Sequence, residues 1–186
     1  VTKPVDAYFP AIGPTHMAQV AGGAFQQGLT PLSMMAAPSF NDAFVREGFA
    51  LAPLFTSGSM YLMAFVAPYE AETAGHATMR ATFTAMGIDS ANTFLVAGWS
   101  SQHHLKGVLE ATNKGGDLTR AGIRRAAGSV YVDSDGMMPQ RELGQNRADA
   151  ESFIAVPDGT IASGVKLLAG NYVGPSAGGY DWESGP

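Results

Sequence analysis

The chain has 186 residues, of which 46% are hydrophobic and 15% charged, a composition typical of a well-buried globular protein. Its net charge of −5 offers no basic surface for nucleic acid or an anionic membrane. The absence of cysteine excludes disulfides, a thiolate nucleophile and a cysteine-based zinc site, and no apolar run reaches the roughly 18 to 20 residues of a membrane helix.

The first 66 residues alternate between strand and helix patterns. Apolar runs at Val5–Phe9 and Leu32–Ala37 each end at a proline, which is typical of buried parallel strands closed by a turn. Between them lies a helical pattern that we expect to be capped by Thr15 and to end at Gly28. Leu51–Val66 is expected to be a third extended stretch. This alternation predicts right-handed βαβ crossovers and a parallel, Rossmann-like sheet.

Two further helical patterns follow a polar connection at residues 68–75. The first spans about His76 to Met86. The second lies in Asn92–Ala111, which we expect to begin as a short extended run and to become helical after Gly98–Ser100. The apolar positions that keep helical spacing there, and should be buried, are Leu105, Val108, Leu109 and Thr112.

Trp99 lies where this change from extended to helical backbone is expected. It has a large apolar ring with one N–H to satisfy, and such a residue is well suited to line a cleft. An equally weighted interpretation is that Trp99 and Phe94 are simply buried.

The last third of the chain predicts one more helix and a hairpin. Asp117 is expected to cap the helix, whose three arginines we interpret as a solvated face rather than an anion site. Alternating runs at Ser129–Val132 and Glu151–Val156 predict the hairpin strands, with a turn at 133–136. Residues 170–186, rich in glycine and proline, are expected to form a strap over the surface.

No recognisable catalytic or metal-binding pattern is present. The histidines lack metal-ligand spacing, and the segment Asp133–Gly136 lacks the later acidic residue that a calcium loop needs. No GxSxG elbow lies between a predicted strand and a predicted helix, and the Walker and GxGxxG motifs are absent. Glu70 and Glu72 could serve in acid–base chemistry, but they lie in the polar connection of residues 68–75, where carboxylates are more often solvated. We therefore predict no catalytic residue, no metal site and no cofactor.

Small and aromatic side chains gather where the expected strands end. Loops after the carboxyl ends of parallel strands cluster at one edge of a sheet, where ligands bind. Residues 12–15 and 37–39 fall at that edge. Together with Phe94 and Trp99 they predict a pocket that excludes water and offers a few hydrogen bonds, which favours recognition over turnover.

The succession of these segments resembles the C-terminal half of a type I periplasmic solute-binding protein, of the branched-chain amino acid ABC-transporter class. The resemblance covers most of the chain and rests on the order VDAYFPAIGPTHMAQVAGGAFQQG, LSMMAAPS, GSMYLMAFVAPYEA, NTFLVAGWSSQHHLKGVLEA, GDLTRAGIRRA and the terminal hairpin. It implies two α/β lobes, joined by three chain crossings, that close on a small molecule.

The resemblance also implies how the chain is divided between the lobes. Residues 1–66 would form part of the second lobe, a partial Rossmann-like lobe, and residues 67–92 a crossover and a helix. Residues 93–128 would be the hinge helix and the following helix of the first lobe, and residues 129–186 its hairpin and a C-terminal strap. A return of the last residues to the second lobe stays open. Since the chain begins at Val1 without an initiator methionine, we expect the other half of the cleft, and any signal or anchor, to lie outside it.

Ligand contacts of the family are carried over by position. They would be Ile12, Gly13, Pro14, Thr15, Ala37, Pro38, Ser39, Phe94 and Trp99. Amino-acid binders of this class commonly place an acidic residue in the second loop to hold the ammonium of the ligand, whereas Pro38 and Ser39 stand there in this sequence. An unpaired buried cation costs several kcal/mol, so an uncharged or acidic ligand is weighted equally with a zwitterionic amino acid.

The hypothesis from sequence is a non-enzymatic solute receptor outside the cytoplasm, periplasmic or lipid-anchored at the cell surface. It would capture a small organic molecule, an amino acid or a related carboxylate, and deliver it to the membrane permease of an ABC transporter. Two alternatives stay open. One is a sensory ligand-binding domain that uses the same cleft, and the other is a Rossmann-like enzyme fragment whose catalytic residues lie elsewhere.

Overall fold

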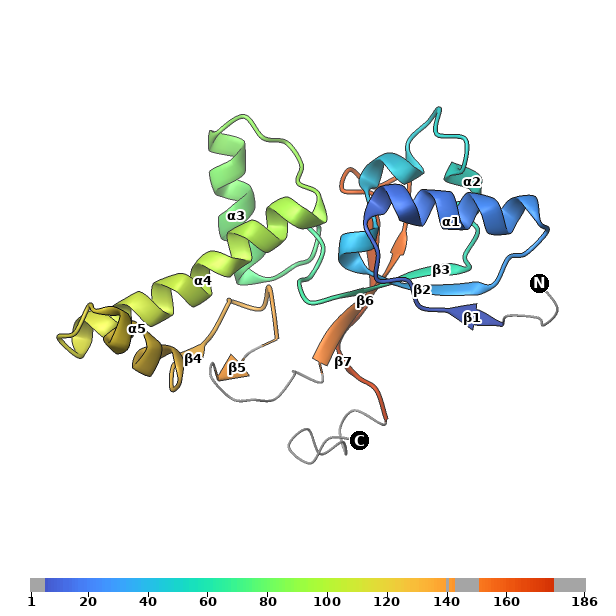
Figure 1. The fold of residues 1–186 in the computed structure, drawn as a ribbon. Helices are drawn as coiled ribbons and strands as arrows, with labels where there is room; N and C mark the ends of the chain where they lie inside the picture. The colour runs from blue at the N-terminus through green and yellow to red at the C-terminus, as the bar shows by residue number, and fades with distance from the viewer. Residues whose placement is uncertain (1–5, 140, 143–150, 176–186) are drawn as a thin grey trace.

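The computed structural model of the protein describes residues 6–139, 141–142 and 151–175 (Figure 1). In chain order, its elements are β1 (Ala7–Tyr8), α1 (Pro14–Gln26), β2 (Leu32–Ala36), η1 (Ala37–Ser39), η2 (Asp42–Val45), α2 (Ala52–Phe55), β3 (Met60–Ala64), α3 (Ala74–Ala85), α4 (Thr93–Lys114), α5 (Arg120–Ala127), β4 (Tyr131–Val132), β5 (Arg141–Glu142), β6 (Glu151–Pro157) and β7 (Val165–Val173). None of the helices within these ranges is both long and apolar enough to cross a membrane.

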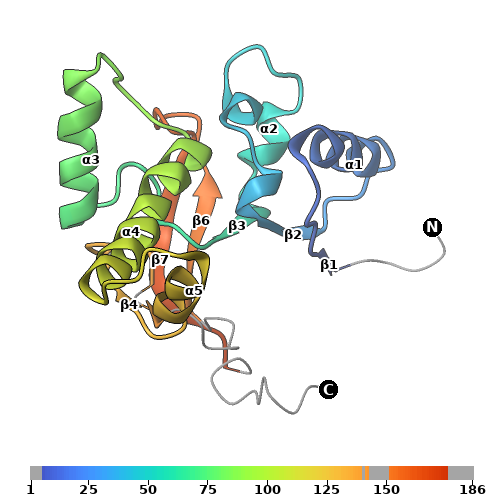
Figure 2. The same cartoon turned by 60° about the vertical axis from the view of Figure 1, so that its left-hand side comes forward.

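A mixed sheet organises the chain. Its described strands run in the order β1-β2-β3-β6-β7, with parallel pairing among the first three and antiparallel pairing from β3 to β6 and from β6 to β7. Helices α1 and α2 pack over one face of it, while α3, α4 and α5 form a second group beside it, with β6 and β7 between the two groups (Figures 1 and 2). The predicted α/β class with a leading parallel sheet is confirmed.

Each group of helices has its own small core. Under α1 and α2, the buried side chains include Met17, Met35, Phe55 and Leu62. A second cluster, which includes Val66, Met79, Phe83, Val96 and Met137, lies between α3 and α4. Between the two lies a cluster of small residues with one aromatic ring, Ala37, Ala64, Ala67 and Phe153. The chain therefore forms two packed bodies that meet at a narrow junction.

The expected third extended stretch is wrong in its first half. Residues Ala52–Phe55 form helix α2, and only Met60–Ala64 is a strand. Gly58 separates them with a φ of +88°, a conformation that side-chain-bearing residues rarely adopt. Leu54 and Phe55 bury their side chains from the helix, so apolar content alone did not distinguish helix from strand.

Two predicted helix starts are also corrected. Helix α1 begins at Pro14, with Gly13 as its N-cap, so Thr15 lies inside the helix. The cap of α5 is Thr119, whose hydroxyl accepts from the Gly122 N–H, 3.2 Å away, rather than Asp117. Asp117 accepts hydrogen bonds from Thr119 and then from Arg125, and these hold the pKa of its carboxyl below the usual value.

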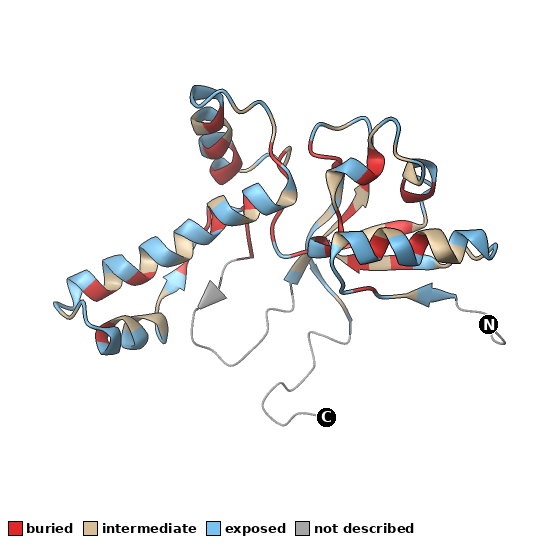
Figure 3. Cartoon of the chain, turned by 45° about the horizontal axis from the view of Figure 1, so that its top comes forward, coloured by how far each residue is buried: buried red, intermediate tan, exposed pale blue. Residues whose placement is uncertain are grey.

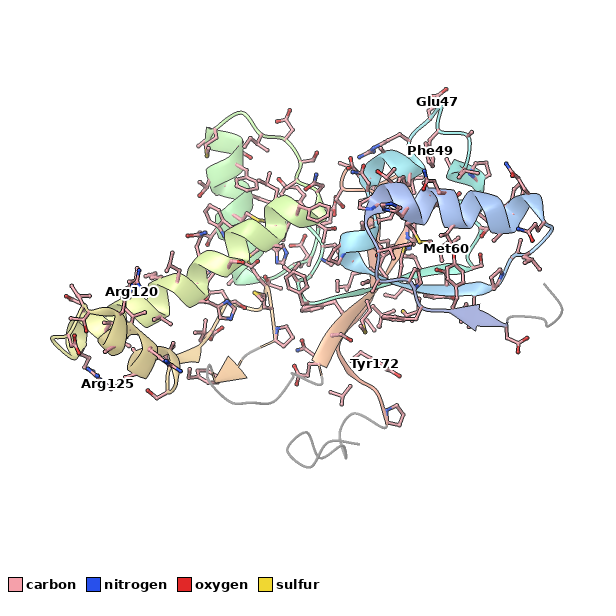
Figure 4. All side chains as sticks on the ribbon, viewed as in Figure 1. Glu47, Phe49, Met60, Arg120, Arg125 and Tyr172 are labelled. Carbon is pink, nitrogen blue, oxygen red and sulfur yellow. The ribbon has the colours of Figure 1, made fainter. Side chains whose placement is uncertain are left out.

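Helix α5 lies at the end of the molecule far from the sheet, where Arg120 and Arg125 are displayed (Figure 4). Arg125 pairs with Asp117, and both side chains of this pair are partly exposed. Ion pairs of this kind contribute little to stability.

Helix α4 is continuous from Thr93, so the extended run expected before Trp99 is wrong. The Asn92 side chain caps it by accepting from the Leu95 N–H, 3.1 Å away. Of the four positions expected to be buried, Val108 and Thr112 are, whereas Leu105 and Leu109 are 54% and 41% exposed. Much of the outward face of α4 is accessible (Figure 3).

The C-terminal hairpin joins a different part of the fold from the one expected. Strand β4 pairs with β5 rather than with β6, and β6 pairs with β3 through Leu62 opposite Ala155 and Ala64 opposite Phe153. The hairpin β6–β7 therefore extends the sheet begun in residues 1–66 instead of belonging to the lobe of the helices. The alternating burial along β6 explains this, because its apolar face needs a neighbouring sheet strand. Residues 176–186 of the expected strap lie outside the described residues.

The connection of residues 65–73 between the two bodies is held by a buried histidine. His76 Nδ1 lies 2.8 Å from the Thr73 hydroxyl, and Nε2 lies 3.2 Å from the Ala67 carbonyl oxygen, which can only accept. Nε2 therefore carries a proton and donates to this carbonyl, and in the neutral ring Nδ1 accepts from the Thr73 hydroxyl. Burial lowers the pKa of His76, because the imidazolium would lose its hydration.

We expect Gly75→Ala to destabilise the fold. An added Cβ would lie 2.4 Å from Met137 Cγ and 2.9 Å from the Ser134 carbonyl oxygen, so backbone as well as a side chain must move. Overpacking of this kind costs about 1 to 3 kcal/mol. Gly98→Ala in α4 is the control, because nothing lies within 4 Å of its added Cβ, and it should stabilise the helix by about 0.5 to 1 kcal/mol. Urea unfolding measures both variants, and equal midpoints would contradict this expectation.

The lowered pKa of His76 predicts a loss of stability on the acid side of neutrality. Below about pH 6.5 the histidine is protonated in the unfolded chain, whereas in the folded chain it stays neutral to lower pH. The contribution of His76 to the free energy of unfolding is therefore complete above that pH and decreases as the pH is lowered through it. His76→Gln keeps a donor for Ala67 without the titration. Urea unfolding between about pH 7 and about pH 5 should show a flatter dependence for this variant, and an unchanged slope would disprove the assignment. His16→Gln, at an exposed position on α1, is the matched control.

Candidate functional site

A buried hydroxyl ties together the two loops that follow the first two strands. Ser39 Oγ accepts from the Ile12 N–H at 3.1 Å and lies 3.3 Å from the Pro10 carbonyl oxygen, to which it donates. The Ser39 side chain is almost fully buried. The two loops predicted to meet at the edge of the sheet therefore do meet, with Ile12 directly against Ser39.

The other loop positions of the predicted site surround this contact. Gly13, Pro14 and Thr15 form the cap and first turn of α1, and Gly13 and Thr15 are exposed. In η1, Ala37 is buried and Pro38 is exposed. Segment η1 contacts α1, β3 and α4, so it lies where the two bodies meet.

Phe94 lines a hollow between the two bodies. The hollow has a volume of about 500 Å³, and its lining residues are Asp42, Ser90, Ala91, Asn92, Phe94, Leu95 and Ala162. A smaller crevice shares three of these residues and adds Phe40, Asn41, Thr93 and Ser163. We call the two together the junction hollow. Phe94 is 50% exposed and lines both parts, so its ring is available to a ligand.

Trp99 does not line the junction hollow. Its ring packs edge-on against Phe83, with 5.5 Å between ring centroids, and it lines a separate hollow of about 540 Å³ along the outer face of α4. Phe94 and Trp99 are five residues apart on one continuous helix, so they point about 140° apart. The structure thus brings the two loops together at Ser39, whereas Phe94 lines a hollow that none of residues 12–15 and 37–39 lines, and Trp99 lines another.

Several residues of the junction hollow escaped the sequence analysis. Asn92 and Asn41 cap α4 and η2, and both are preferred N-cap residues, so helix-start signals were able to indicate them. Ala162 and Ser163 had no such signal. They reach the hollow only because the β6–β7 hairpin joins the sheet next to β3.

The charged groups at the hollow have partners within the protein. Asp42 pairs with Arg46 at 3.2 Å, and Arg46 also donates to the carbonyl oxygens of Ile161 and Ala162. Glu70 accepts from Ser163, so the solvated role expected for this carboxylate is wrong. Glu72 instead forms an exposed pair with Arg80 at 3.4 Å.

The chemistry of the junction hollow is that of recognition. It offers an exposed aromatic ring, side-chain amides and a carboxylate already neutralised by a guanidinium. Within the ranges that the structure describes, no group of three or more histidine, aspartate or glutamate side chains is placed to hold a metal ion.

A scan against protein-family models and a search of curated proteins gave no match. Among solved structures, the chain is similar to a fatty acid ABC transporter substrate-binding protein from Thermomonospora curvata, with a TM-score of 0.80 and 20% identity over 95% of this chain. It is also similar to an ABC transporter substrate-binding protein from Aeropyrum pernix, with a TM-score of 0.66 and 12% identity over 92% of the chain. The chain spans 45% and 46% of these two proteins. Its fold is therefore that of about half of a substrate-binding protein.

We expect Ser39→Ala to loosen the contact between the two loops. The variant leaves the Ile12 N–H and the Pro10 carbonyl without their partner, and a lost buried hydrogen bond costs about 1 to 3 kcal/mol. Ser101→Ala, which removes an exposed hydroxyl bonded within α4, should cost far less. Urea unfolding measures the loss of stability, and amide hydrogen exchange of Ile12 shows whether the loss arises at this loop. An unchanged exchange rate at Ile12 would show that Ser39 does not hold the loop.

Proposed function

We propose that this chain is part of the solute-binding component of an ABC transporter, which captures a small organic molecule between two lobes without altering it. The observation that carries the proposal is the junction hollow, where strand-end loops of the sheet meet the first turn of α4. The likeness in fold to two substrate-binding proteins supports it. The chain spans less than half of each of them, so the activity of a whole receptor is part of the proposal.

The finer assignments belong to the same proposal. We place the chain in the C-terminal half of a type I protein of the branched-chain amino acid class, working outside the cytoplasm with a membrane permease as partner. Residues 1–66 then belong to the second lobe, 67–92 to the crossover and 93–128 to the first lobe. One boundary changes from the sequence prediction, because β6 and β7 pair into the sheet of the second lobe.

The lining of the junction hollow suggests the kind of solute. Phe94 and Leu95 offer an apolar surface, and Asn92 offers an amide that both donates and accepts. Asp42 gives the second loop a carboxylate, although Arg46 already neutralises it. We propose an amino acid or a related carboxylate, with its apolar part against Phe94 and its polar groups at Asn92 and at Asn41, which follows the loop of residues 37–39.

A ligand panel tests the proposed function. The full chain is heated with L-amino acids, short carboxylates, aromatic acids and medium-chain fatty acids, the last because one structural neighbour is described as a fatty acid transporter protein. A compound that binds only the folded state at 100 times its Kd stabilises it by about 2.7 kcal/mol, and so raises Tm. Calorimetry then confirms binding, and chromatography should recover the compound unchanged. No shift with any class, or conversion of the compound, would overturn the proposal.

Phe94→Ala should weaken binding of the compound that gives the largest shift in this panel. Losing part of the buried area of one phenyl ring should raise Kd roughly 5- to 50-fold. Phe25→Ala is a matched control, because Phe25 is 53% exposed on α1 and lines no part of the junction hollow. Trp99→Ala tests the position that the sequence also predicted. A loss of affinity with Trp99→Ala but not with Phe94→Ala would move the site to the hollow on the outer face of α4.

A further inference from the structure

Glu70 connects two segments that are far apart in the sequence. It lies in the connection of residues 65–73, and its Oε1 accepts from the Ser163 N–H at 3.1 Å, while its Oε2 accepts from the Ser163 hydroxyl at 2.5 Å. Ser163 belongs to the turn between β6 and β7 and is only 3% exposed. Both carboxylate oxygens of Glu70 are thus engaged by the same residue, and hydrogen bonds to carboxylates are among the stronger ones in proteins.

The same turn is held from its other side by Arg46. This guanidinium donates to the carbonyl oxygens of Ile161 and Ala162, the two residues just before Ser163. The turn also lies close to η2, since a Cβ added at Gly159 would be 2.6 Å from the Val45 carbonyl oxygen. The turn is therefore fixed between a carboxylate of the connection and a guanidinium and backbone at the end of η2.

This turn is one wall of the junction hollow. Ala162 lines the larger part, and Ser163 lines the adjoining crevice, and Phe94 lines both. Glu70 itself is absent from both linings, so it acts on the hollow through Ser163 and not by contact with its contents.

We infer that Glu70 is a positioning residue, which holds the β6–β7 turn in the wall of the junction hollow and couples that wall to the connection between the two bodies. The inference rests on the proposed function only in taking the hollow as a solute site. Any movement of the connection of residues 65–73 relative to the sheet changes the Glu70–Ser163 contact first. The wall of the hollow is then displaced together with the connection.

Amide hydrogen exchange of the full, ligand-free chain tests this inference. Glu70→Ala should accelerate exchange at Ser163 by roughly 10- to 100-fold, the factor expected from losing a hydrogen bond to a charged group, and leave the amides of β3 unchanged. Glu72→Ala is the matched control, since it removes a carboxylate two residues away whose side chain is 89% exposed. Glu70→Gln keeps one acceptor for the Ser163 N–H and should restore most of the protection.

The same spectra report on the hollow itself. In Glu70→Ala the backbone resonances of Ala162 and of Phe94 should shift together, whereas Glu72→Ala should leave both in place. Unchanged exchange at Ser163 would overturn the inference, and so would equal acceleration throughout the sheet, which would show a general loss of stability. The exchange experiment needs no solute. A ligand panel in which no compound binds would therefore refute the proposed function and leave this result standing.

Discussion

The pairing of β3 with β6 is the constraint on which the rest of this structure depends. Strand β3 is parallel to β2 on one side and antiparallel to β6 on the other, with Leu62 opposite Ala155 and Ala64 opposite Phe153. Between β3 and β6 the chain leaves the sheet, builds the helical group and returns. Because β6 pairs with β3, the chain rejoins the sheet there, and the β6–β7 turn lies close to the start of α4.

The narrow contact between the two bodies follows from this path. Each body buries its own cluster of large apolar side chains, while the junction between them is built from three alanines and Phe153. Small side chains let backbone segments approach closely but bury little apolar area, so they stabilise the junction less than either core. Hydrogen bonds add to this packing along the connection of residues 65–73, through His76 with Ala67 and Glu70 with Ser163. A site that changes shape when two bodies move is best placed at such a junction.

The junction hollow draws its walls from four separate parts of the sequence. These are the segment after β2, the residues that lead into α4, the first turn of α4 and the β6–β7 turn. Its one described carboxylate is neutralised by Arg46, and its aromatic ring is half exposed. The groups that the hollow offers are therefore amides, an apolar surface and an ion-paired carboxylate.

The sequence by itself determined the features that depend on neighbouring residues. Prolines and glycines at the ends of apolar runs marked β1, β2 and α1, and helical spacing marked α3, because these signals act within a few residues. It also indicated that the loops of Ile12 and Ser39 meet, since parallel strands place their carboxyl ends on one edge. Only the tertiary structure decided that α4 starts at Thr93, which turned Trp99 away from Phe94, and that β6 pairs with β3 and not with β4. Those outcomes depend on which apolar faces pack against residues far away in the sequence, and local sequence patterns do not specify such long-range contacts.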